Sequence, residues 1–336
     1  MKFLTTTALL AAVTVCSGSA HAACDRMEKV SAVWLPIMQT TAYYVALEER
    51  LFEKACIEIV SNKLEAPNQI IDALVGARAD FGPPGAAAGI AMLAESKFPG
   101  TFKVFGLQGG GIKVGLINDG LIVKPDSDIK SFADLKGKAL GLSTAGDTIT
   151  LSTVRLLDAK GIKAGDYTAK AVVGTPARFA CLKSGECAAV PMGQPEDLEA
   201  IAQGFPRLGF TYEAGADLIF NVDMVRRAWG EKNKDVLVRF VRAMASTYAF
   251  MNDPRNRDEV VAIVKDTGKL SDDVARQIFA PYLEPGRNVL PKRGELSLPA
   301  LERVLTLMAE VGAIPKPVPS AERFVDLQYL KAAGIQ

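Results

Sequence analysis

Histidine is almost absent from this sequence, since His21 is the only one among 336 residues. Its absence elsewhere excludes Ser-His-acid and Cys-His catalysis, histidine acid–base chemistry and histidine zinc sites from the rest of the chain. The G-x-x-x-x-G-K-[ST] and G-x-G-x-x-G motifs are also missing. Residues 141–145 (Gly-Leu-Ser-Thr-Ala) approach the G-x-S-x-G elbow of hydrolases but lack its final glycine and a base. We therefore expect no enzyme, no cofactor and no metal site.

An excess of charge of either sign is lacking too, because 39 Lys and Arg residues balance 38 Asp and Glu residues. A nucleic-acid binder normally carries a basic excess on one face, so nucleic acid is excluded as a partner. Aromatic residues make up only 7% of the chain, but a hydrophobic share of 49% is enough for packed cores and excludes wholesale disorder. The length suggests two domains of about 100–200 residues each.

Apolar runs long enough to span a membrane, about 20 residues, are absent as well. The first 22 residues resemble a secretory signal peptide, with Lys2, an apolar stretch at 8–16 and an A-x-A site at 20–22. We predict cleavage after residue 22 and a periplasmic protein that has no histidine and equal numbers of basic and acidic residues. The alternative is a lipid anchor on Cys24, although a histidine stands where the usual lipobox has leucine.

Four cysteines would remain after cleavage, and four cysteines allow three pairings. Export to an oxidising compartment favours disulfides. We predict a Cys24–Cys56 bond, which flanks a strand–helix unit, and a Cys181–Cys187 bond, which closes a short turn. A metal site is the alternative, but the second pair lacks the two-to-four-residue spacing of zinc ligands.

From Val30 onward, short apolar runs alternate with helical patterns, which is typical of βαβ units and a largely parallel sheet. Strands are predicted at 30–35, 57–60, 80–82, 140–142, 171–173 and 187–191. Helices are predicted at 68–75, 86–95, 148–160, 175–182, 235–252, 257–265, 272–279 and 298–311. The segment 102–123 is apolar but interrupted by glycines, which suggests strands that leave one domain for another.

Two segments that lie 109 residues apart repeat the same pattern of helix end, turn and strand, beginning at Gly76 and at Gly185. The repeat favours an α/β fold of two lobes with like topology, each a mostly parallel sheet flanked by helices. We expect residues 23–120 and 215–336 to form lobe I and residues 121–214 to form lobe II. The chain would then cross between the lobes twice, near residue 121 and again within 211–220.

Loops rich in small and polar residues follow the predicted strands. In open α/β sheets, ligands bind at the carboxyl ends of strands, where helix N-termini offer free N–H groups. The candidate ligand contacts are Trp34, Gln39, Thr40, Tyr43, Gly82, Pro83, Pro84, Ser143, Thr144, Gly146, Thr148, Arg178, Met192 and Gln194.

The segment 143–148 is the most informative of these loops, because its hydroxyls lie beside the free amides of a predicted helix start and suit an oxyanion. Asp147 would repel an anion, so we expect it to turn back and cap the helix. Arg178 could hold a carboxylate with two hydrogen bonds, although a solvated arginine is the alternative.

Aromatic stacking is expected from Trp34 and Tyr43. The neighbouring Tyr44 has the helical phase of the core, which leaves Tyr43 to face a cleft. Burial in the core is the alternative for Trp34. Met192 and Gln194 are expected contacts in the second lobe, although a methionine often fills a core.

The motifs of the chain resemble a known family along most of its length. The segments that carry the resemblance are 39–54, 72–81 (Asp-Ala-Leu-x-Gly-x-x-Ala-Asp-Phe), 129–138 (Ile-Lys-Ser-Phe-Ala-Asp-Leu-Lys-Gly-Lys) and 194–205. They are similar to the substrate-binding proteins of nitrate, sulfonate and taurine ABC importers, a superfamily that also includes binders of thiamine-pyrimidine precursors. The resemblance implies a periplasmic-binding-protein fold and a cleft that closes on a small molecule. It also implies delivery to ABC permease subunits and, through them, an ATPase.

The resemblance predicts the fold more closely than the ligand, because Ala189 stands where the family usually has an acidic residue. We expect a monomeric protein that captures a small organic anion, a sulfonate or carboxylate with an aromatic or apolar part. A neutral heterocycle such as a pyrimidine or flavin precursor is the alternative ligand. A secreted enzyme without histidine and a sensor partner are the alternatives of other kinds. A related fungal branch makes a pyrimidine precursor with an active-site histidine, which the mature chain would lack.

Overall fold

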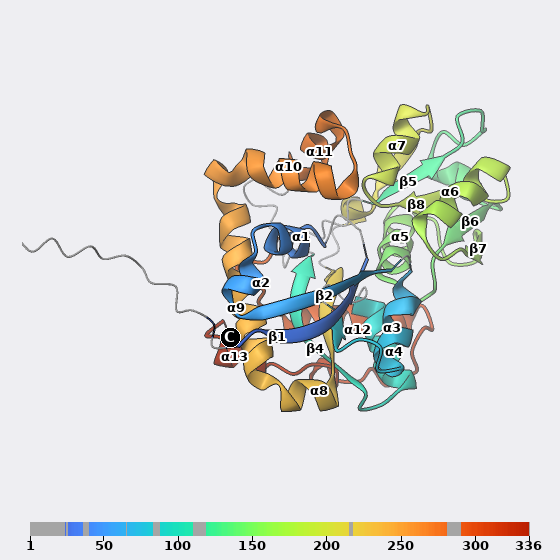
Figure 1. Cartoon of the computed structure of the whole chain (residues 1–336). Coiled ribbons are helices and arrows are strands. Elements are labelled where there is room, and N and C mark those ends of the chain that lie inside the picture. Colours follow the sequence, from blue (N-terminus) through green and yellow to red (C-terminus); the bar gives the residue numbers. More distant parts are fainter. Residues whose placement is uncertain are drawn as a thin grey trace, which may run out of the picture.

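The computed structural model describes residues 24, 26–35, 40–64, 66–82, 88–109, 119–214, 218–280 and 290–335. Within them, two five-stranded sheets are each flanked by helices and form two lobes (Figure 1). The predicted α/β, two-lobed fold class is thereby confirmed. The predicted signal peptide and three candidate contacts, Gln39, Pro83 and Pro84, lie outside the described residues.

The first sheet has the strand order β2-β1-β3-β10-β4. Its strands are β1 (Glu28–Trp34), β2 (Ile57–Lys63), β3 (Phe81–Gly82), β4 (Phe102–Gly109) and β10 (Asn221–Arg226). Strand β1 is parallel to β2 and β3, whereas β10 runs antiparallel to both β3 and β4.

The second sheet has the order β7-β6-β8-β5-β9. Its strands are β5 (Gly120–Val123), β6 (Ala139–Leu142), β7 (Thr168–Ala171), β8 (Ala189–Met192) and β9 (Arg207–Phe210). Strand β6 is parallel to β7 and β8, and β5 runs antiparallel to β8 and β9. The repeated segments of the sequence lead into β3 and β8, which hold the same third position in the two sheets.

Thirteen α-helices are found in the described part of the chain, and its longest is α9. They are α1 (Thr41–Glu48), α2 (Leu51–Lys54), α3 (Pro67–Val75), α4 (Ala88–Lys97), α5 (Thr148–Ala159), α6 (Thr175–Ser184), α7 (Glu196–Ala202), α8 (Arg227–Lys232), α9 (Lys234–Asn252), α10 (Arg257–Gly268), α11 (Asp272–Phe279), α12 (Leu298–Glu310) and α13 (Gln328–Ala332). Short 3-10 helices cover Phe132–Leu135, Thr211–Ala214, Pro254–Asn256 and Ala321–Arg323. No helix in these ranges is long and apolar enough to cross a membrane.

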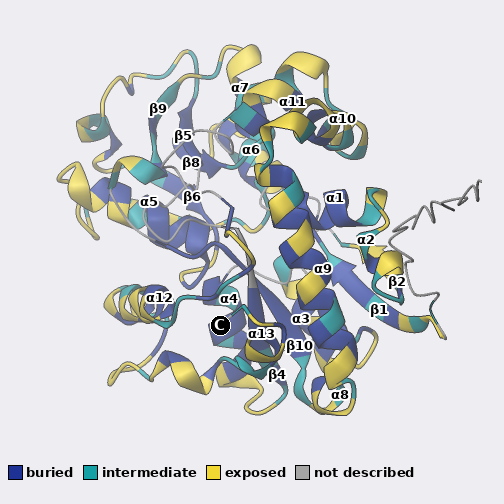
Figure 2. Ribbon diagram, turned by 90° about the vertical axis from the view of Figure 1, so that its left-hand side faces the viewer, coloured by how far each residue is buried: buried dark blue, intermediate teal, exposed yellow. Residues whose placement is uncertain are grey.

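The first lobe is held together by aromatic packing around α9. Phe240 stacks on Phe52 with ring centroids 5.1 Å apart and meets Phe81 edge to face at 5.0 Å. The buried faces of the helices point to the sheet and their exposed faces point outward, as the alternating colours of α9 show (Figure 2). The apolar residues of α9 recur at helical spacing, so burying one face explains both its length and its place over the sheet.

The second sheet buries side chains on both of its faces. One face packs Leu140 of β6 against Leu156 and Leu157 of α5. The other face packs Val190 of β8 against Leu182 of α6. A strand covered on both sides needs to be apolar throughout, and the short strands β5, β6 and β8 meet that need.

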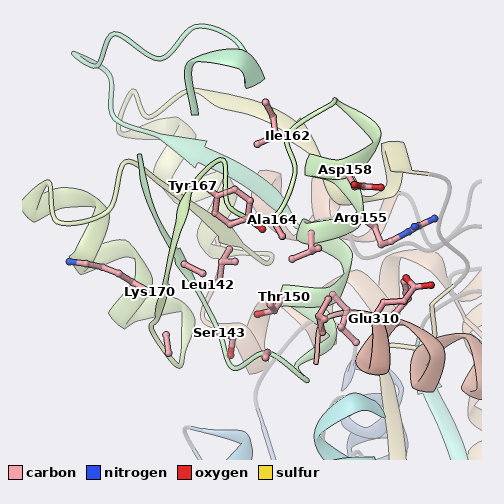
Figure 3. Close-up of a pocket in the computed structure, with 17 residues that line it drawn as sticks. Leu142, Ser143, Thr150, Arg155, Asp158, Ile162, Ala164, Tyr167, Lys170 and Glu310 are labelled. Carbon is pink, nitrogen blue, oxygen red and sulfur yellow. The ribbon is translucent and has the colours of Figure 1, made fainter. Parts of the chain in front are cut away.

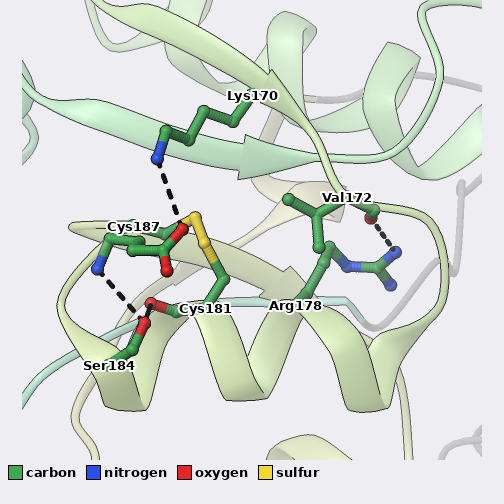
Figure 4. The surroundings of a disulfide bond; sticks show 7 residues. Lys170, Val172, Arg178, Cys181, Ser184 and Cys187 are labelled. Atoms are coloured by element: carbon green, nitrogen blue, oxygen red, sulfur yellow. Dashed lines mark hydrogen bonds and ion pairs between the residues drawn. A yellow bond between two sulfur atoms is a disulfide. The ribbon is translucent and has the colours of Figure 1, made fainter.

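Both predicted disulfides are present. Cys24 and Cys56 are bonded with Cα atoms 5.5 Å apart, and Cys181 and Cys187 with Cα atoms 5.3 Å apart. The second bond ties α6 to the turn that enters β8 (Figure 4).

One predicted strand is displaced, because 171–173 was expected and β7 covers Thr168–Ala171. The glycine at 174 has φ +91° and turns the chain into α6, which leaves Val173 42% exposed. The apolar pair at 172–173 therefore marks the turn rather than the strand.

Candidate functional site

Three chain segments meet at one edge of the second sheet. Strands β6 and β8 are parallel, so the residues after Leu142 and after Met192 leave the sheet at the same edge. Strand β5 runs in the opposite direction and begins there, since Gly120 pairs with Met192. Asp119, which precedes β5, thus joins the loops that follow β6 and β8.

The loop after β6 is organised by Asp147. Its Oδ2 accepts a hydrogen bond of 2.6 Å from the Ser143 hydroxyl, and its Oδ1 accepts one of 3.4 Å from the Ile149 N–H. Asp147 therefore caps α5, as expected. Burial raises the pKa of Asp147, while the Ser143 hydroxyl acts against that rise. Of the candidate contacts in this loop, Ser143 is buried and Thr144 is exposed.

The first lobe approaches this loop closely. The Gly89 N–H of α4 donates to Thr148 Oγ1 at 3.5 Å, and a Cβ on Gly89 would lie 1.7 Å from the Gly146 carbonyl oxygen. Because α4 is the helix that comes after β3, this contact brings the carboxyl ends of the two sheets toward each other. Gly82, the last residue of β3, thus lies on the lobe that faces Ser143.

Arg178 is 3% exposed and uses its guanidinium within the protein. Its Nε donates to the Pro191 carbonyl at 2.8 Å, and one terminal nitrogen donates to Thr175 Oγ1 at 2.9 Å. The other terminal nitrogen donates to the Val172 carbonyl at 3.4 Å, as Figure 4 shows. Arg178 thus ties the start of α6 to the ends of β7 and β8. Burial lowers its pKa, and the nearby Asp147 and Asp119 oppose that shift.

Two carboxyl groups that the sequence analysis did not select lie at this edge. Asp119 is 1% exposed, and burial raises its pKa to about 8 against the opposing charge of Arg178. Its Oδ2 has no hydrogen-bond partner among the described residues. Burial also raises the pKa of Glu196, at the start of α7. The sequence signal for Asp119 is an acid directly before an apolar strand, within the segment 102–123 that predicts strands passing between the domains.

A buried ion pair lies just beyond the loop after β8, between the first turn of α7 and the start of β9. Asp197 is fully buried, and its Oδ2 lies 2.6 Å from a terminal nitrogen of Arg207. Burial raises the pKa of Asp197 to about 6 although Arg207 acts in the opposite direction. Of the candidate contacts here, Met192 is fully buried in the core and Gln194 is half-buried in the loop.

Besides Gly82, the described candidates of the first lobe are Trp34 at the end of β1, Thr40 just before α1 and Tyr43 within α1, and their side chains make contacts inside this lobe. Tyr43 is fully buried, and its hydroxyl lies 3.0 Å from Ser61 Oγ, so our expectation that it faces a cleft is wrong. Burial raises the pKa of Tyr43. The Thr40 hydroxyl donates to the Leu35 carbonyl at 3.0 Å. Trp34 is half-buried and packs against Tyr43 and Tyr44 at 5.8 and 4.9 Å between ring centroids.

Ser143, Thr148, Arg178 and Gln194 thus lie in the segments that follow β6, β7 and β8 of the second sheet, and Thr148 is hydrogen-bonded to the first lobe. Tyr43 lies in the core of the first lobe. Within the described ranges, no three His, Cys, Asp or Glu side chains are grouped so as to hold a metal ion.

Solved structures share this fold. The ligand-binding component of an ABC-type import system from Staphylococcus aureus has a TM-score of 0.77 and 17% identity over 92% of this chain and 100% of its own. An alkanesulfonate-binding protein from Xanthomonas axonopodis, bound to MOPS, has a TM-score of 0.72 and 18% identity over 89% and 98%. The periplasmic nitrate-binding protein of Synechocystis has a TM-score of 0.72 and 13% identity over 92% and 88%.

At the level of sequence, no functionally curated protein matches the chain. The model of the NMT1-like family matches residues 26–265, which include both sheets and α1 to α9. The chain therefore belongs to the NMT1-like family.

Proposed function

We propose that the chain is the exported solute-binding component of an ABC importer. It would capture a small molecule between its lobes and deliver it to permease subunits that an ATPase drives. The observation that carries the proposal is that the carboxyl ends of the two sheets approach each other, with buried polar side chains at the second. The shared fold with a ligand-binding component of an import system supports it.

Closure of the lobes on the ligand is the mechanism we propose. The chain passes from the first sheet to the second between β4 and β5 and returns between β9 and β10, and this connectivity is compatible with a rotation of one lobe against the other. A ligand that touches both edges stabilises the closed arrangement by the difference between its affinities for the closed and open forms.

The charges at the second sheet favour a neutral ligand that has N–H or O–H donors, such as the heterocycle of the sequence analysis. Arg178 already donates to three oxygens of the protein. The carboxyl groups of Asp119, Asp147 and Glu196 lie near it, so an added anion would meet more acidic than basic groups. A donor on the ligand would instead find carboxyl oxygens as acceptors.

A small organic anion is the second candidate ligand. The exposed hydroxyl of Thr144 and the first turn of α5 are suited to an oxyanion, and the alkanesulfonate-binding protein has the same fold. Such a ligand would depend on backbone N–H groups, because the Ser143 hydroxyl already donates to Asp147.

Isothermal titration calorimetry of the mature protein against pyrimidines, sulfonates and aromatic carboxylates separates these candidates. We expect saturable binding of an uncharged heterocycle and at least a tenfold loss of affinity, about 1.4 kcal/mol, in Asp119→Ala. The exposed Asp126→Ala serves as the control and should bind as the unmodified protein does.

Binding of sulfonates or carboxylates alone would establish the anion instead. If no member of the panel binds and the protein converts a candidate substrate with repeated turnover, the binding proposal fails and the enzyme alternative replaces it.

A further inference from the structure

A pocket of about 560 Å³ lies beside α5 at the β7 edge of the second sheet. Figure 3 shows Tyr167 and Ile162 on one side of it, and Glu310, on a helix of the first lobe, on the other. The volume falls within the range of small-molecule sites, about 300–1,000 Å³.

The pocket exists because β7 carries small side chains where its neighbour carries large ones. In the sheet, Leu140 and Leu142 of β6 pair with Ala169 and Ala171 of β7. Directly paired residues point to the same face, so the leucine layer that covers β6 is not continued on β7. Both alanines line the pocket and are exposed.

The walls of the pocket belong to two different cores. Val154 of α5 packs with the second sheet, whereas Leu307 of α12 and Val311, just after that helix, pack with the first lobe. All three side chains line the pocket. Its width therefore depends on how the two lobes are placed relative to each other.

The charges around the pocket balance. Arg155 and Lys170 face Asp158 and Glu310 among the lining residues. Asp158 is paired with Lys163, which lies outside the lining, at 2.6 Å. Lys170 is likewise paired with Glu186 outside the lining, at 3.6 Å, so the rim offers no net charge to a ligand. The lining between these groups is mostly aliphatic with one aromatic ring, Tyr167. Ser143 borders one end, but its hydroxyl is committed to Asp147.

We propose that this pocket is a second ligand site for a neutral and mainly apolar aromatic molecule. It is distinct from the candidate site at the carboxyl ends of β6 and β8 (the strand-end site), with which it shares Ser143. An uncharged ring system gains from burial against Val154, Leu307 and the alanines and loses no hydration of a charge. Because the walls come from both lobes, a molecule bound in the pocket favours one arrangement of the lobes. It therefore changes the affinity of the strand-end site for its ligand, and that ligand changes the affinity of the pocket by the same factor.

Fluorescence titration of the mature protein with N-phenyl-1-naphthylamine, an uncharged aromatic dye, tests the site. We expect saturable binding at one site per chain. Ala171→Leu extends the leucine layer of β6 onto β7 and fills part of the pocket, so it should weaken binding of the dye by about tenfold or more. Ala177→Leu is the matched control, since Ala177 is an exposed alanine of α6 outside the pocket, and should bind the dye unchanged.

Leu307→Ala tests the wall that the first lobe contributes, and we expect it also to weaken the dye. The anionic analogue 8-anilinonaphthalene-1-sulfonate should bind more weakly than the neutral dye. Equal affinities in Ala171→Leu and the unmodified protein would overturn the site. Tighter binding of the anionic dye would overturn the ligand class, and full affinity in Leu307→Ala would overturn the role of both lobes.

Discussion

Asp119 is a buried carboxyl group whose protonation should set the pH dependence of stability. Burial raises its pKa to about 8 in the folded protein, whereas the pKa of an aspartate in an unfolded chain is about 3.9. Between these values the folded state holds a proton that the unfolded state has released. The free energy of unfolding therefore falls as pH rises from about 4 to 8. The groups that face Asp119 are Arg178, Asp197, Asp147 and Glu196.

Asp119→Asn replaces the protonated carboxyl with a neutral group of the same shape. We expect it to flatten the fall in stability and to be more stable than the unmodified protein at pH 8 by on the order of 2 kcal/mol. Urea unfolding at pH 5, 6.5 and 8 measures the effect. Raised pKa values of Asp197 and Glu196 act in the same direction, so part of the fall should remain. A variant with an unchanged pH slope would show that Asp119 is ionised in the fold.

Single residues also show where sequence reasoning stops. The helical phase assigned Tyr44 to the core and Tyr43 to a cleft, yet every residue from Thr41 to Ala46 is buried. Helix α1 lies against both α9 and α10, so more than one of its faces is covered. The spacing of its apolar residues therefore does not distinguish buried from exposed positions. Asp119 was missed for a related reason, because its burial depends on an antiparallel strand pairing that the local sequence does not encode.

Elements with one strong apolar face were predictable. Helix α11 has the expected bounds, and α9 and α12 differ from expectation by one residue at one end, because the spacing of their apolar residues requires a single buried face. Strand β7 was misplaced because it lies at a sheet edge, and its alanines give little periodic signal. The order of strands within each sheet could not be predicted, since it depends on pairings between distant segments.

Helix α9 offers a test of how much one aromatic side chain contributes to the first lobe. Phe240→Ala removes a ring that contacts Phe52, Phe81 and Phe105, and we expect a loss of about 3–5 kcal/mol in the free energy of unfolding. Phe250→Ala on the same helix removes a half-buried ring and should cost less than half as much. Urea unfolding monitored by circular dichroism compares the two. Similar losses would contradict the central place of Phe240 in this core.

At the scale of the whole molecule, the two lobes meet through a close backbone contact as well as through side chains. A Cβ on Gly89 would meet the Gly146 carbonyl at 1.7 Å, and one on Gly146 would meet Leu93 Cδ1 at 2.3 Å. Leu151 of α5 is buried in the core of the first lobe. The observed arrangement of the lobes therefore includes a close approach that a side chain at residue 89 would block.

Gly89→Ala distinguishes an effect on the stability of helix α4 from an effect on the arrangement of the two lobes. Alanine is better than glycine within a helix by about 1 kcal/mol, so α4 itself should gain stability. The added methyl cannot be accommodated against the backbone of Gly146, so we expect the lobes to move apart and the radius of gyration to rise in small-angle X-ray scattering. Ser96→Ala, an exposed change on the same helix, should leave the radius unchanged. Ligand affinity should fall in Gly89→Ala alone, because the lobes then reach the closed arrangement only against this clash. An unchanged radius together with full affinity would mean that α4 and α5 can shift locally, and the lobe arrangement would then be set elsewhere.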